Sequence, residues 1–439
     1  MSVIDPKVVD EVAKELEIKD IAKASIRQIG ALVRTIEERL GVEYIHFEMG
    51  IPGLPPSAVG VEAECEALRS GVASVYPVID GIQPVKEAAS RFVKAFLDVD
   101  INPLGCIPTV GSMQASFASL MLCSHLDAKR DTVLYIDPGF PVQKMQAQVI
   151  GVKVESFDIA DYRECGLAEK IESCFAQGNI CAIIYSSPNN PSWMCLNEQE
   201  LEIIGRLARE YDVVVIEDLA YMTMDFRRDI GKPFEAPYQP TVAKYTDNYV
   251  LMMSASKIFS YAGQRIALAC ISDKLYHRHY DTLASRYGIS RFGAAFAYIY
   301  LYTFSSGVSH SAQYAMAAML NRACDGSYRF VEDIREYAVR TAKIKEILYR
   351  NGFHVVYDKD NDEPVSDGFF FTVGYRKMSG AELIRNLLYY GVSGIDLATT
   401  GSSRQGIRAC SSNIKPHHYA LLEERLKAFD EAYTKPKLA

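Results

Sequence analysis

A single amine among small hydroxylated residues is the first candidate for chemistry in this sequence. The stretch SASKIFSYAGQR, residues 254–265, places Lys257 directly after Ser256 and close behind the apolar run YVLMM. An apolar run of this kind is typical of a buried strand, so we expect Lys257 at the edge of a sheet. There the amine can act as a nucleophile toward a carbonyl compound, and a solvated surface charge is the alternative.

Three other apolar runs also end in polar residues. Asp218 ends VVVIED, and Tyr221 follows it three positions later. The run ICAIIYS leads into SPNNPSW, where prolines flank a pair of asparagines that includes Asn190. The run CIPTV leads into a glycine turn at 111–113 and an alanine-rich helix, whose N-terminus favours an anion such as phosphate. Each signal alone is weak, because strand-end acids and asparagine–proline turns are more often structural.

The elements that position these residues alternate along the chain. Between about 105 and 272, short β-branched runs alternate with helix-length amphipathic stretches, which predicts a mainly parallel sheet with helical crossovers. Ligands of such sheets bind beyond the carboxyl ends of the strands. An anion cradle, a buried acid, an amide, a phenol and an amine therefore meet at one sheet edge. Pyridoxal phosphate, with its phosphate, aldehyde, ring nitrogen and phenolic oxygen, needs that set.

The remaining segments predict a second, smaller domain. From about residue 328 a long charged helix pattern is followed by short apolar strands, which is typical of an α+β domain. The proline-rich GIPGLPPS at 50–57 predicts a crossing between an N-terminal segment and the large domain. We therefore predict an N-terminal arm and small-domain segment at 1–55, a large domain at 56–325 and a C-terminal small domain at 326–439.

Composition excludes several other classes of protein. The 439 residues carry a net charge of −8, which argues against nucleic acid as the main partner. The first twenty residues have no apolar core of a signal peptide, and the longest apolar block, at 292–304, is too short to cross a bilayer. We expect a soluble, cytoplasmic protein. The ten cysteines and eight histidines match no zinc spacing, so no metal site is predicted.

With these residues at its strand ends, the chain resembles the fold-type I pyridoxal-phosphate enzymes of the class I/II aminotransferase family. The family pattern N-P-x-N-P-T-G appears as SPNNPSW at 187–193, D-x-A-Y is intact at 218–221, and S-x-S-K followed by G-x-R is intact at 254–265. The resemblance runs from about Gly50 to about Arg408. It implies an α/β fold with a mainly parallel seven-stranded sheet flanked by helices, plus a smaller α+β domain formed by the N- and C-terminal parts.

The resemblance implies roles for the residues around the cofactor ring. Lys257 would hold pyridoxal phosphate as a Schiff base and later move the substrate's proton. Asp218 would keep the pyridine nitrogen protonated, so that the ring can accept electrons. Asn190 and Tyr221 would donate hydrogen bonds to the phenolic oxygen. The catalytic residues implied are therefore Lys257, Asp218 and Tyr221.

The resemblance also implies a phosphate grip and a shared active site. Phe140 would stack on the pyridine ring, with a plain core phenylalanine as the alternative. Tyr76 matches a tyrosine that reaches the phosphate of the neighbouring subunit, which predicts a homodimer. The phosphate itself would be held by Gly111, Ser112, Met113, Ser254, Ser256 and Arg265.

Substrate recognition is implied for a further set of residues. Arg408 matches the family's binder of the substrate α-carboxylate, with a structural ion pair as the alternative, and Gly50 matches a glycine whose backbone approaches the substrate together with Asn190. Trp193 replaces the family's usual glycine, and we hypothesise that it lines the substrate side-chain pocket, with surface packing as the alternative. For Arg286 and Arg291 a surface or interface position is favoured over recognition of a distal carboxylate.

The sequence therefore predicts a pyridoxal-phosphate-dependent aminotransferase that moves an amino group from an amino acid to a 2-keto acid by a ping-pong mechanism. The alternative on the same fold is a C–S β-lyase, a related lyase or a decarboxylase, because the cofactor residues do not fix the reaction. An effector domain of a transcription regulator is disfavoured by the short acidic segment before Gly50. A binding protein without catalysis is disfavoured by the intact Lys257, Asp218 and Arg408. Both substrates remain open.

Overall fold

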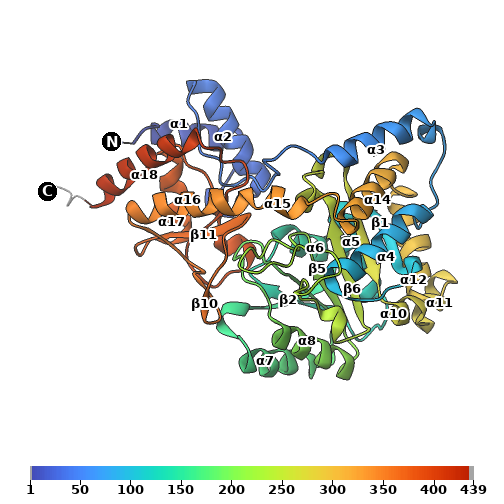
Figure 1. The fold of residues 1–439 in the computed structure, drawn as a ribbon. Coiled ribbons are helices and arrows are strands. Elements are labelled where there is room, and N and C mark those ends of the chain that lie inside the picture. The colour runs from blue at the N-terminus through green and yellow to red at the C-terminus, as the bar shows by residue number, and fades with distance from the viewer. Residues whose placement is uncertain (1, 435–439) are drawn as a thin grey trace. The chain divides into compact units, whose positions relative to one another are not determined.

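The computed structural model describes residues 2–434, which form two compact units (Figure 1). Unit 1 combines the chain up to Leu54, the short segment Asn190–Met194 and the chain from Arg335 onward. Unit 2 comprises Pro55–Asn189 and Cys195–Ile334.

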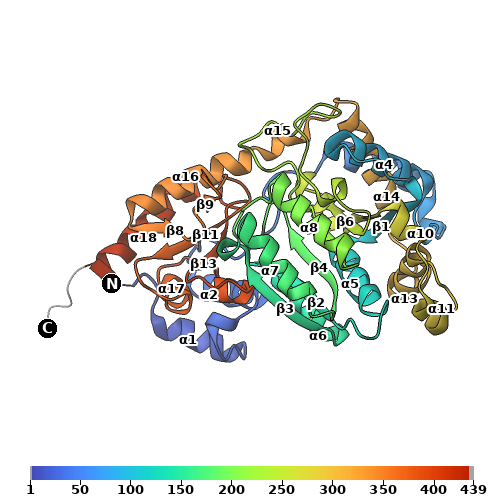
Figure 2. The same ribbon diagram turned by 90° about the horizontal axis from the view of Figure 1, so that it is seen from below.

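Unit 2 contains a seven-stranded sheet with helices on both of its sides (Figures 1 and 2). The strands lie in the order β1-β7-β6-β5-β4-β2-β3, and all neighbours are parallel except β7, which is antiparallel to both β1 and β6. The predicted mainly parallel sheet is thus confirmed. The strands are β1 (Cys106–Val110), β2 (Thr132–Asp137), β3 (Lys153–Asp158), β4 (Ile180–Ser186), β5 (Val214–Asp218), β6 (Tyr249–Ser254) and β7 (Ile266–Ile271).

The central strands are buried on both faces, as their continuous β-branched runs require. Helix α5 (Gly111–Ser124) covers one face, and its small residues Ala115 and Ala118 pack in one core with Ile216 of β5 and Met252 of β6. Because side chains alternate along a strand, Asp218 shares this face with Ile216, whereas the residue between them points to the other side.

The other helices of unit 2 connect and cover the strands. Their bounds are α3 (Ala58–Arg69), α4 (Gln83–Leu97), α6 (Pro141–Ile150), α7 (Cys165–Phe175), α8 (Glu198–Glu210), α9 (Ala255–Ile258), α10 (Asp273–His277), α11 (Asp281–Tyr287), α12 (Phe292–Ala295), the π-helical η7 (Phe296–Leu301), α13 (Tyr302–Ser305), α14 (His310–Cys324) and α15 (Phe330–Ile334). None of the described helices is both long and apolar enough to span a membrane.

Unit 1 is built around an antiparallel sheet in the order β12-β13-β11-β8. Segments from both ends of the described chain share its core, which contains Val12, Ile36, Phe371 and Phe429. The strands are β8 (Phe353–Val355), β11 (Phe370–Tyr375), β12 (Ile395–Asp396) and β13 (Ile407–Cys410), beside the small pair β9 (Lys359–Asp360) and β10 (Glu363–Pro364). The helices are α1 (Pro6–Glu15), α2 (Ile26–Leu40), α16 (Glu336–Arg350), α17 (Gly380–Leu388) and α18 (His418–Thr434).

Candidate active site

Strand register brings the predicted cofactor residues of unit 2 to one edge of the sheet. Val110 at the end of β1 pairs with Ile266 at the start of β7, and Ser254 at the end of β6 pairs with Ala267. Because β7 is antiparallel to its neighbours, the residue before it, Arg265, lies at the same edge as the carboxyl ends of β1 and β6. This juxtaposition agrees with the edge predicted from the sequence.

The first candidate group is a cationic cradle at the N-terminus of α5. Gly111 has φ +67°, a conformation that favours glycine, and a Cβ at this position would lie 2.3 Å from Nη2 of Arg265 and would displace the guanidinium. No side chain caps the first turn of α5. Arg265 is exposed and donates from Nη1 to the Ala262 carbonyl at 3.0 Å, and no acidic side chain within residues 2–434 lies at ion-pair distance from it. Helix end and guanidinium together favour an anion.

The first turn of α5 is held by side chains of α6 and of α5 itself. The carbonyl of Met113 accepts hydrogen bonds from Gln146 Nε2 of α6 at 2.8 Å and from Ser116 Oγ at 3.1 Å. The Gln114 side chain accepts from the Val110 amide at 2.7 Å. Ser112 is half-buried in this turn. These bonds hold the helix start in place without occupying the Ser112 side chain.

Lys257 lies in the short helix α9, directly beyond the carboxyl end of β6. Oγ of Ser254 accepts a hydrogen bond from the Ser256 amide at 3.2 Å and so caps α9. Ser254 and Ser256 are buried, and Lys257 is half-buried. The strand end and the cap place Lys257 just beyond the carboxyl end of β6.

Asp218 is a buried acid at the same edge. Its side chain accepts hydrogen bonds from Gln143 Nε2 at 3.0 Å and from the Ala220 amide at 3.1 Å. Burial raises the pKa of Asp218 to about 6, although both hydrogen bonds favour the charged form. Within the described part of the chain, no cationic side chain lies at ion-pair distance from this carboxyl group. The protonated ring nitrogen of pyridoxal phosphate would be a suitable cationic partner for this carboxyl group.

The loops after β2 and β4 complete this edge. Phe140 is half-buried in front of α6, and its carbonyl accepts from the Gln143 amide at 3.1 Å. Asn189 donates from Nδ2 to the Pro138 carbonyl at 2.8 Å and thereby joins the two loops. Tyr221 is buried three residues beyond Asp218. Sequence reasoning missed Gln143 and the bridging Asn189; a polar residue in an otherwise apolar first turn, as in DPGFPVQ, was the available signal for Gln143.

Unit 1 gathers a second group around Arg408 of β13. The side chain of Arg408 is only 1% exposed, its guanidinium lies 4.9 Å from the centre of the Phe370 ring, and Nη2 donates to the Glu48 carbonyl. A Cβ at Gly50 would lie 3.0 Å from Cζ of Phe370 and 3.8 Å from Nη1 of Arg408. Glycine therefore lets the N-terminal segment approach the guanidinium closely.

Trp193 belongs to the same group in unit 1. Its side chain is fully buried, with its ring 6.3 Å from that of Phe370, and its backbone has a left-handed φ of +64°. A Cβ at Gly368 would lie 2.1 Å from Cε2 of Trp193, so the indole fills the space that this glycine leaves open. Asn190, at the start of the same short segment, is also buried.

Three other predicted residues lie elsewhere in unit 2. Tyr76 precedes α4 and is 89% exposed. Arg286 and Arg291 are both exposed; the guanidinium of Arg286 lies 5.4 Å from the centre of the Tyr287 ring, and Arg291 precedes α12. Neither arginine lies at the strand-end edge.

One cluster in unit 1 offers metal-ligand atoms among the described residues. Atoms of Glu43, His417 and His418 lie within 4.8 Å of one another. Both ring nitrogens of His418 are already engaged, because Nδ1 accepts from the Lys415 amide at 3.0 Å and Nε2 lies 3.3 Å from the Glu43 carboxylate. The cluster is therefore held together by its own hydrogen bonds.

Comparison with known proteins gives matches over most of the chain. Residues 42–393 match the model of the family described as aminotransferase class I and II. The chain is 30% identical to the glutamate-pyruvate aminotransferase AlaC of Escherichia coli over 54% of its length and 56% of that protein. It is 24% identical to a probable aspartate aminotransferase of Methanocaldococcus jannaschii over 80% of its length and 82% of that protein. The first match thus spans little more than half of its relative.

Solved structures with the same fold match nearly the whole chain. An aspartate aminotransferase from Thermus thermophilus, solved with maleate, superposes with a TM-score of 0.73 at 20% identity, covering 93% of this chain and 96% of that one. An alanine aminotransferase from Pyrococcus furiosus gives a TM-score of 0.75 at 19% identity, covering 95% and 99%. At these identities the likeness establishes the fold.

Proposed function

Because the chain belongs to the aminotransferase class I and II family, we propose that it is a homodimeric transaminase that holds pyridoxal phosphate at Lys257. The family and fold predicted from the sequence are confirmed, and the transaminase activity is proposed from membership of that family. Members of this family use pyridoxal phosphate and act on amino and keto acids. Which residues of this chain bind each group is the proposal developed here.

The cationic cradle carries the proposal most directly. Arg265 lies against Gly111 at an uncapped helix start, and it has no acidic partner within the described residues. We assign the phosphate group to this cradle, together with Ser112, Met113, Ser254 and Ser256. Phe140, in the loop after β2, is assigned to the face of the ring.

The buried acid supplies the second line of support. When bound, pyridoxal phosphate provides an aldehyde that bonds to amines and a ring that accepts electrons. Asp218 would hold a proton on the ring nitrogen, and that cation would supply the partner which the Asp218 carboxyl group lacks. Lys257 would bond to the aldehyde and, once released by substrate, carry the proton from the substrate's Cα. Tyr221 and Asn190 would hydrogen-bond the phenolic oxygen.

We assign substrate binding to the group in unit 1. A buried arginine beside a glycine backbone suits a carboxylate, which a guanidinium binds with two parallel hydrogen bonds. Arg408 would therefore take the substrate's α-carboxylate, with Gly50 allowing the close approach. We propose that Trp193, which packs beside Phe370, sets the size of the pocket for the substrate's side chain. Replacement of Trp193 by Ala should then change the relative kcat/KM for large and small amino acids, and an unchanged profile would reduce Trp193 to packing.

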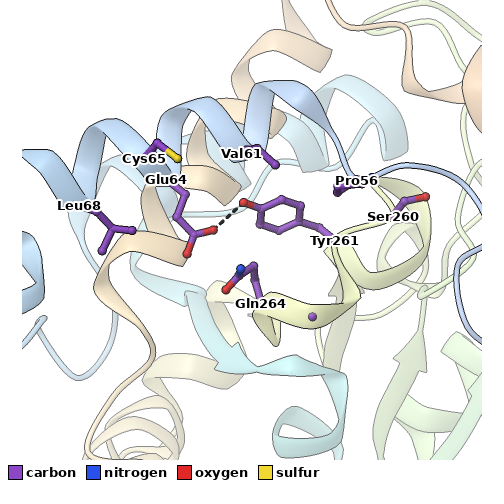
Figure 3. Close-up of a pocket in the computed structure, with 9 residues that line it drawn as sticks. Pro56, Val61, Glu64, Cys65, Leu68, Ser260, Tyr261 and Gln264 are labelled. Carbon is purple, nitrogen blue, oxygen red and sulfur yellow. Dashed lines mark hydrogen bonds between the residues drawn. The ribbon is translucent and has the colours of Figure 1, made fainter.

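Exposed apolar residues around α3 support a homodimer. A surface groove of about 460 Å³ is lined by α3 residues such as Val61 and Leu68 and by the segment Ser260–Gln264 that leads to Arg265 (Figure 3). In it the Tyr261 hydroxyl donates to Glu64 at 2.5 Å (Figure 3). Val61, Leu68 and, beyond α3, Tyr76 are exposed. A second copy covering this face would bring its Tyr76 toward the phosphate cradle, which is the proposed shared active site.

A cytoplasmic location is also proposed. All ten cysteines are free thiols, and most are buried. Free thiols in this number are typical of a reducing compartment.

A half-reaction screen tests the function. The purified protein is loaded with pyridoxal phosphate, and its visible absorption is followed while single amino acids are added, beginning with alanine, aspartate and glutamate. Each reactive amino acid should bleach the band once per site, and a 2-keto acid should restore it. The Arg408→Lys variant should need a much higher amino acid concentration.

Each other outcome has a distinct meaning. Release of pyruvate and ammonia from one amino acid without a keto acid would indicate a lyase, and release of carbon dioxide would indicate a decarboxylase. A broad panel of amino acids that all leave the band unchanged would overturn the proposed transamination.

A further inference from the structure

A histidine in unit 1 lies between two carboxylates. His46 contacts Glu48 through Nδ1 at 2.9 Å and Glu37 of α2 through Nε2 at 3.0 Å. A ring with an acceptor at each nitrogen satisfies both only as the imidazolium, because neutral imidazole has a single N–H. Burial opposes the charged form, but the hydrogen bonds and charges of Glu48 and Glu37 outweigh it and raise the pKa of His46. His46 is therefore a half-buried side chain whose charged form is favoured by both of its carboxylate partners.

The inner carboxylate, Glu48, is fully buried and fixed at both oxygens. Oε1 faces His46, and Oε2 accepts a hydrogen bond from the Ser393 hydroxyl. The backbone carbonyl of the same residue accepts from Nη2 of Arg408. Glu48 thus connects the histidine to the guanidinium proposed to bind the substrate's carboxylate.

The backbone on either side of Glu48 is tied to the sheet of unit 1. Ile45 donates to the Gly391 carbonyl at 2.8 Å and accepts from the Ser393 amide at 3.0 Å, and Phe47 accepts from the Cys410 amide at 2.9 Å. These bonds set the course of residues 45–47. Beyond Glu48, the Ile51 carbonyl accepts a hydrogen bond from the Ser412 hydroxyl. Between these tied points, Glu48 is held by the contacts of its own side chain.

We propose that His46 and Glu48 are positioning residues that hold Arg408 in the orientation needed for the substrate's α-carboxylate. The inference rests on the proposed function of Arg408. In this arrangement Glu37, His46 and the Glu48 side chain form one ion-paired chain, and the Glu48 carbonyl and the Phe370 ring together fix the guanidinium. Loss of the imidazolium would leave the buried Glu48 carboxylate and the half-buried Glu37 carboxylate without their shared cation, and the Glu48 carbonyl would move.

The only tryptophan of the chain provides a direct readout of this site. Trp193 packs beside Phe370, over which Arg408 lies, so its fluorescence should respond to a carboxylate bound at Arg408. Propionate is titrated into the holoenzyme as a probe without an amino group, with propionamide as the uncharged control. The test variants are His46→Gln and Glu48→Gln. Glu43→Gln is the matched control, because this carboxylate precedes the same segment but is exposed and pairs with His418.

The expected result is a selective loss of carboxylate affinity. The Kd of propionate should rise about fivefold or more in His46→Gln and Glu48→Gln and stay within about twofold in Glu43→Gln. In the wild type the Kd should rise as pH increases through the raised pKa of His46, and this dependence should be absent from His46→Gln. With a reactive amino acid, KM should rise while kcat changes little.

Other results would overturn the inference. Unchanged propionate affinity in both folded variants would show that Arg408 needs neither residue. If those variants fail to fold, Ser393→Ala removes one hydrogen bond from Glu48, and the same affinity in that variant would also contradict the proposal. If the wild type shows no saturable binding of propionate, Arg408 does not bind carboxylates and the inference falls. The half-reaction screen decides separately whether the protein is a transaminase.

Discussion

At the scale of single residues, Asp218 and its neighbour Glu217 are two buried acids of β5 that face opposite sides of the sheet. Asp218 faces the α5 side of the sheet, where only neutral donors meet it. Glu217 points to the opposite side, where the Thr241 hydroxyl donates to it at 2.5 Å and the Val242 amide at 3.2 Å. Burial raises the pKa of Glu217 to about 7. Replacement of these two acids should therefore have different effects on activity.

Asp218→Asn should stabilise the cofactor-free protein and inactivate the enzyme. Below about pH 4 the carboxyl group is neutral in both folded and unfolded chains, and as pH rises through about 6 only the folded protein holds a charge away from water. The variant should therefore gain about 3 kcal/mol of unfolding free energy at pH 8 and little at pH 4. Urea denaturation at both pH values measures this. With cofactor present, kcat should fall at least about 100-fold.

Glu217→Gln is the matched control for this prediction. It also removes a buried charge from β5, so the cofactor-free protein should again be more stable at pH 8. Because Glu217 faces away from the proposed site, cofactor affinity and kcat should change less than about threefold. Equal loss of activity in both variants would contradict the special role of Asp218.

At this scale the sequence was informative where a residue directly follows a strand. The places of Lys257 and Asp218 in the fold could be predicted because Asp218 ends an apolar run and Lys257 closely follows one, and the register of the sheet brings these strand ends to one edge. Gln143 and His46 could not be predicted in this way. Asp218, the partner of Gln143, and Glu37, one partner of His46, come from other segments, and a pattern along the chain does not report such contacts.

At the scale of elements, the start of α5 and the start of β7 form one structural pair. Gly111→Ala should weaken cofactor binding, because the added methyl group would lie 2.3 Å from Nη2 of Arg265 and the residue would keep a positive φ. We expect the Kd of pyridoxal phosphate to rise about 100-fold, measured by the return of visible absorption to the cofactor-free protein.

Gly151→Ala controls for backbone strain alone. Gly151 ends α6 with φ +84° and has open space around it. Both alanine variants should lose about 1 kcal/mol of unfolding free energy from the left-handed conformation. Only Gly111→Ala should lose cofactor affinity, and a loss of equal size in Gly151→Ala would argue against the cradle.

The loop with Trp193 and the segment before β11 also pack against each other, because the indole lies against Gly368. Gly368→Ala would place a methyl group 2.1 Å from the indole and should lower the unfolding free energy by about 2–3 kcal/mol. Trp193→Leu in the same chain should recover much of that loss, since the smaller side chain vacates the space. Gly166→Ala in α7, where nothing lies within 4 Å, should be neutral or stabilising. Urea denaturation of Gly368→Ala, Trp193→Leu, the double variant and Gly166→Ala checks this, and independent effects of the two substitutions would contradict the pairing.

Elements with a strong periodicity were predicted well. The apolar runs CIPTV and ICAIIYS coincide with β1 and β4, and VVVIED and YVLMM agree with β5 and β6 to within one residue. The charged pattern from 328 to 352 was expected as one helix and is two, α15 and α16, which meet at Arg335. The pattern is continuous across that residue, so packing within each unit decides the break.

At the scale of the whole molecule, the proposed shared active site can be tested with hybrid dimers. Lys257→Ala and Tyr76→Ala subunits are each expected to have little activity alone. Mixed in equal amounts, half of the dimers are hybrids with one complete site, so about a quarter of wild-type activity should return. Transaminase activity after subunit exchange measures this. No gain over the separate variants would contradict a site that uses Tyr76 of the second copy.

The chain's organisation above its elements was only partly accessible from its sequence. The order of motifs from Gly50 to Arg408 was sufficient to predict the family, which the match over residues 42–393 confirms. The inclusion of Asn190–Met194 in unit 1 could not be read from the chain, because that segment lies between two parts of unit 2. The division at 1–55, 56–325 and 326–439 stays a proposal.

Borohydride reduction tests the central claim most directly. The protein loaded with pyridoxal phosphate should absorb in the visible range, and reduction should fix one pyridoxyl group per chain on Lys257, identified by mass spectrometry of the peptide that contains SASKIFSYAGQR. Lys257→Ala should bind the cofactor without covalent labelling at this peptide. A label on another lysine, or no visible absorption after addition of the cofactor, would contradict the account.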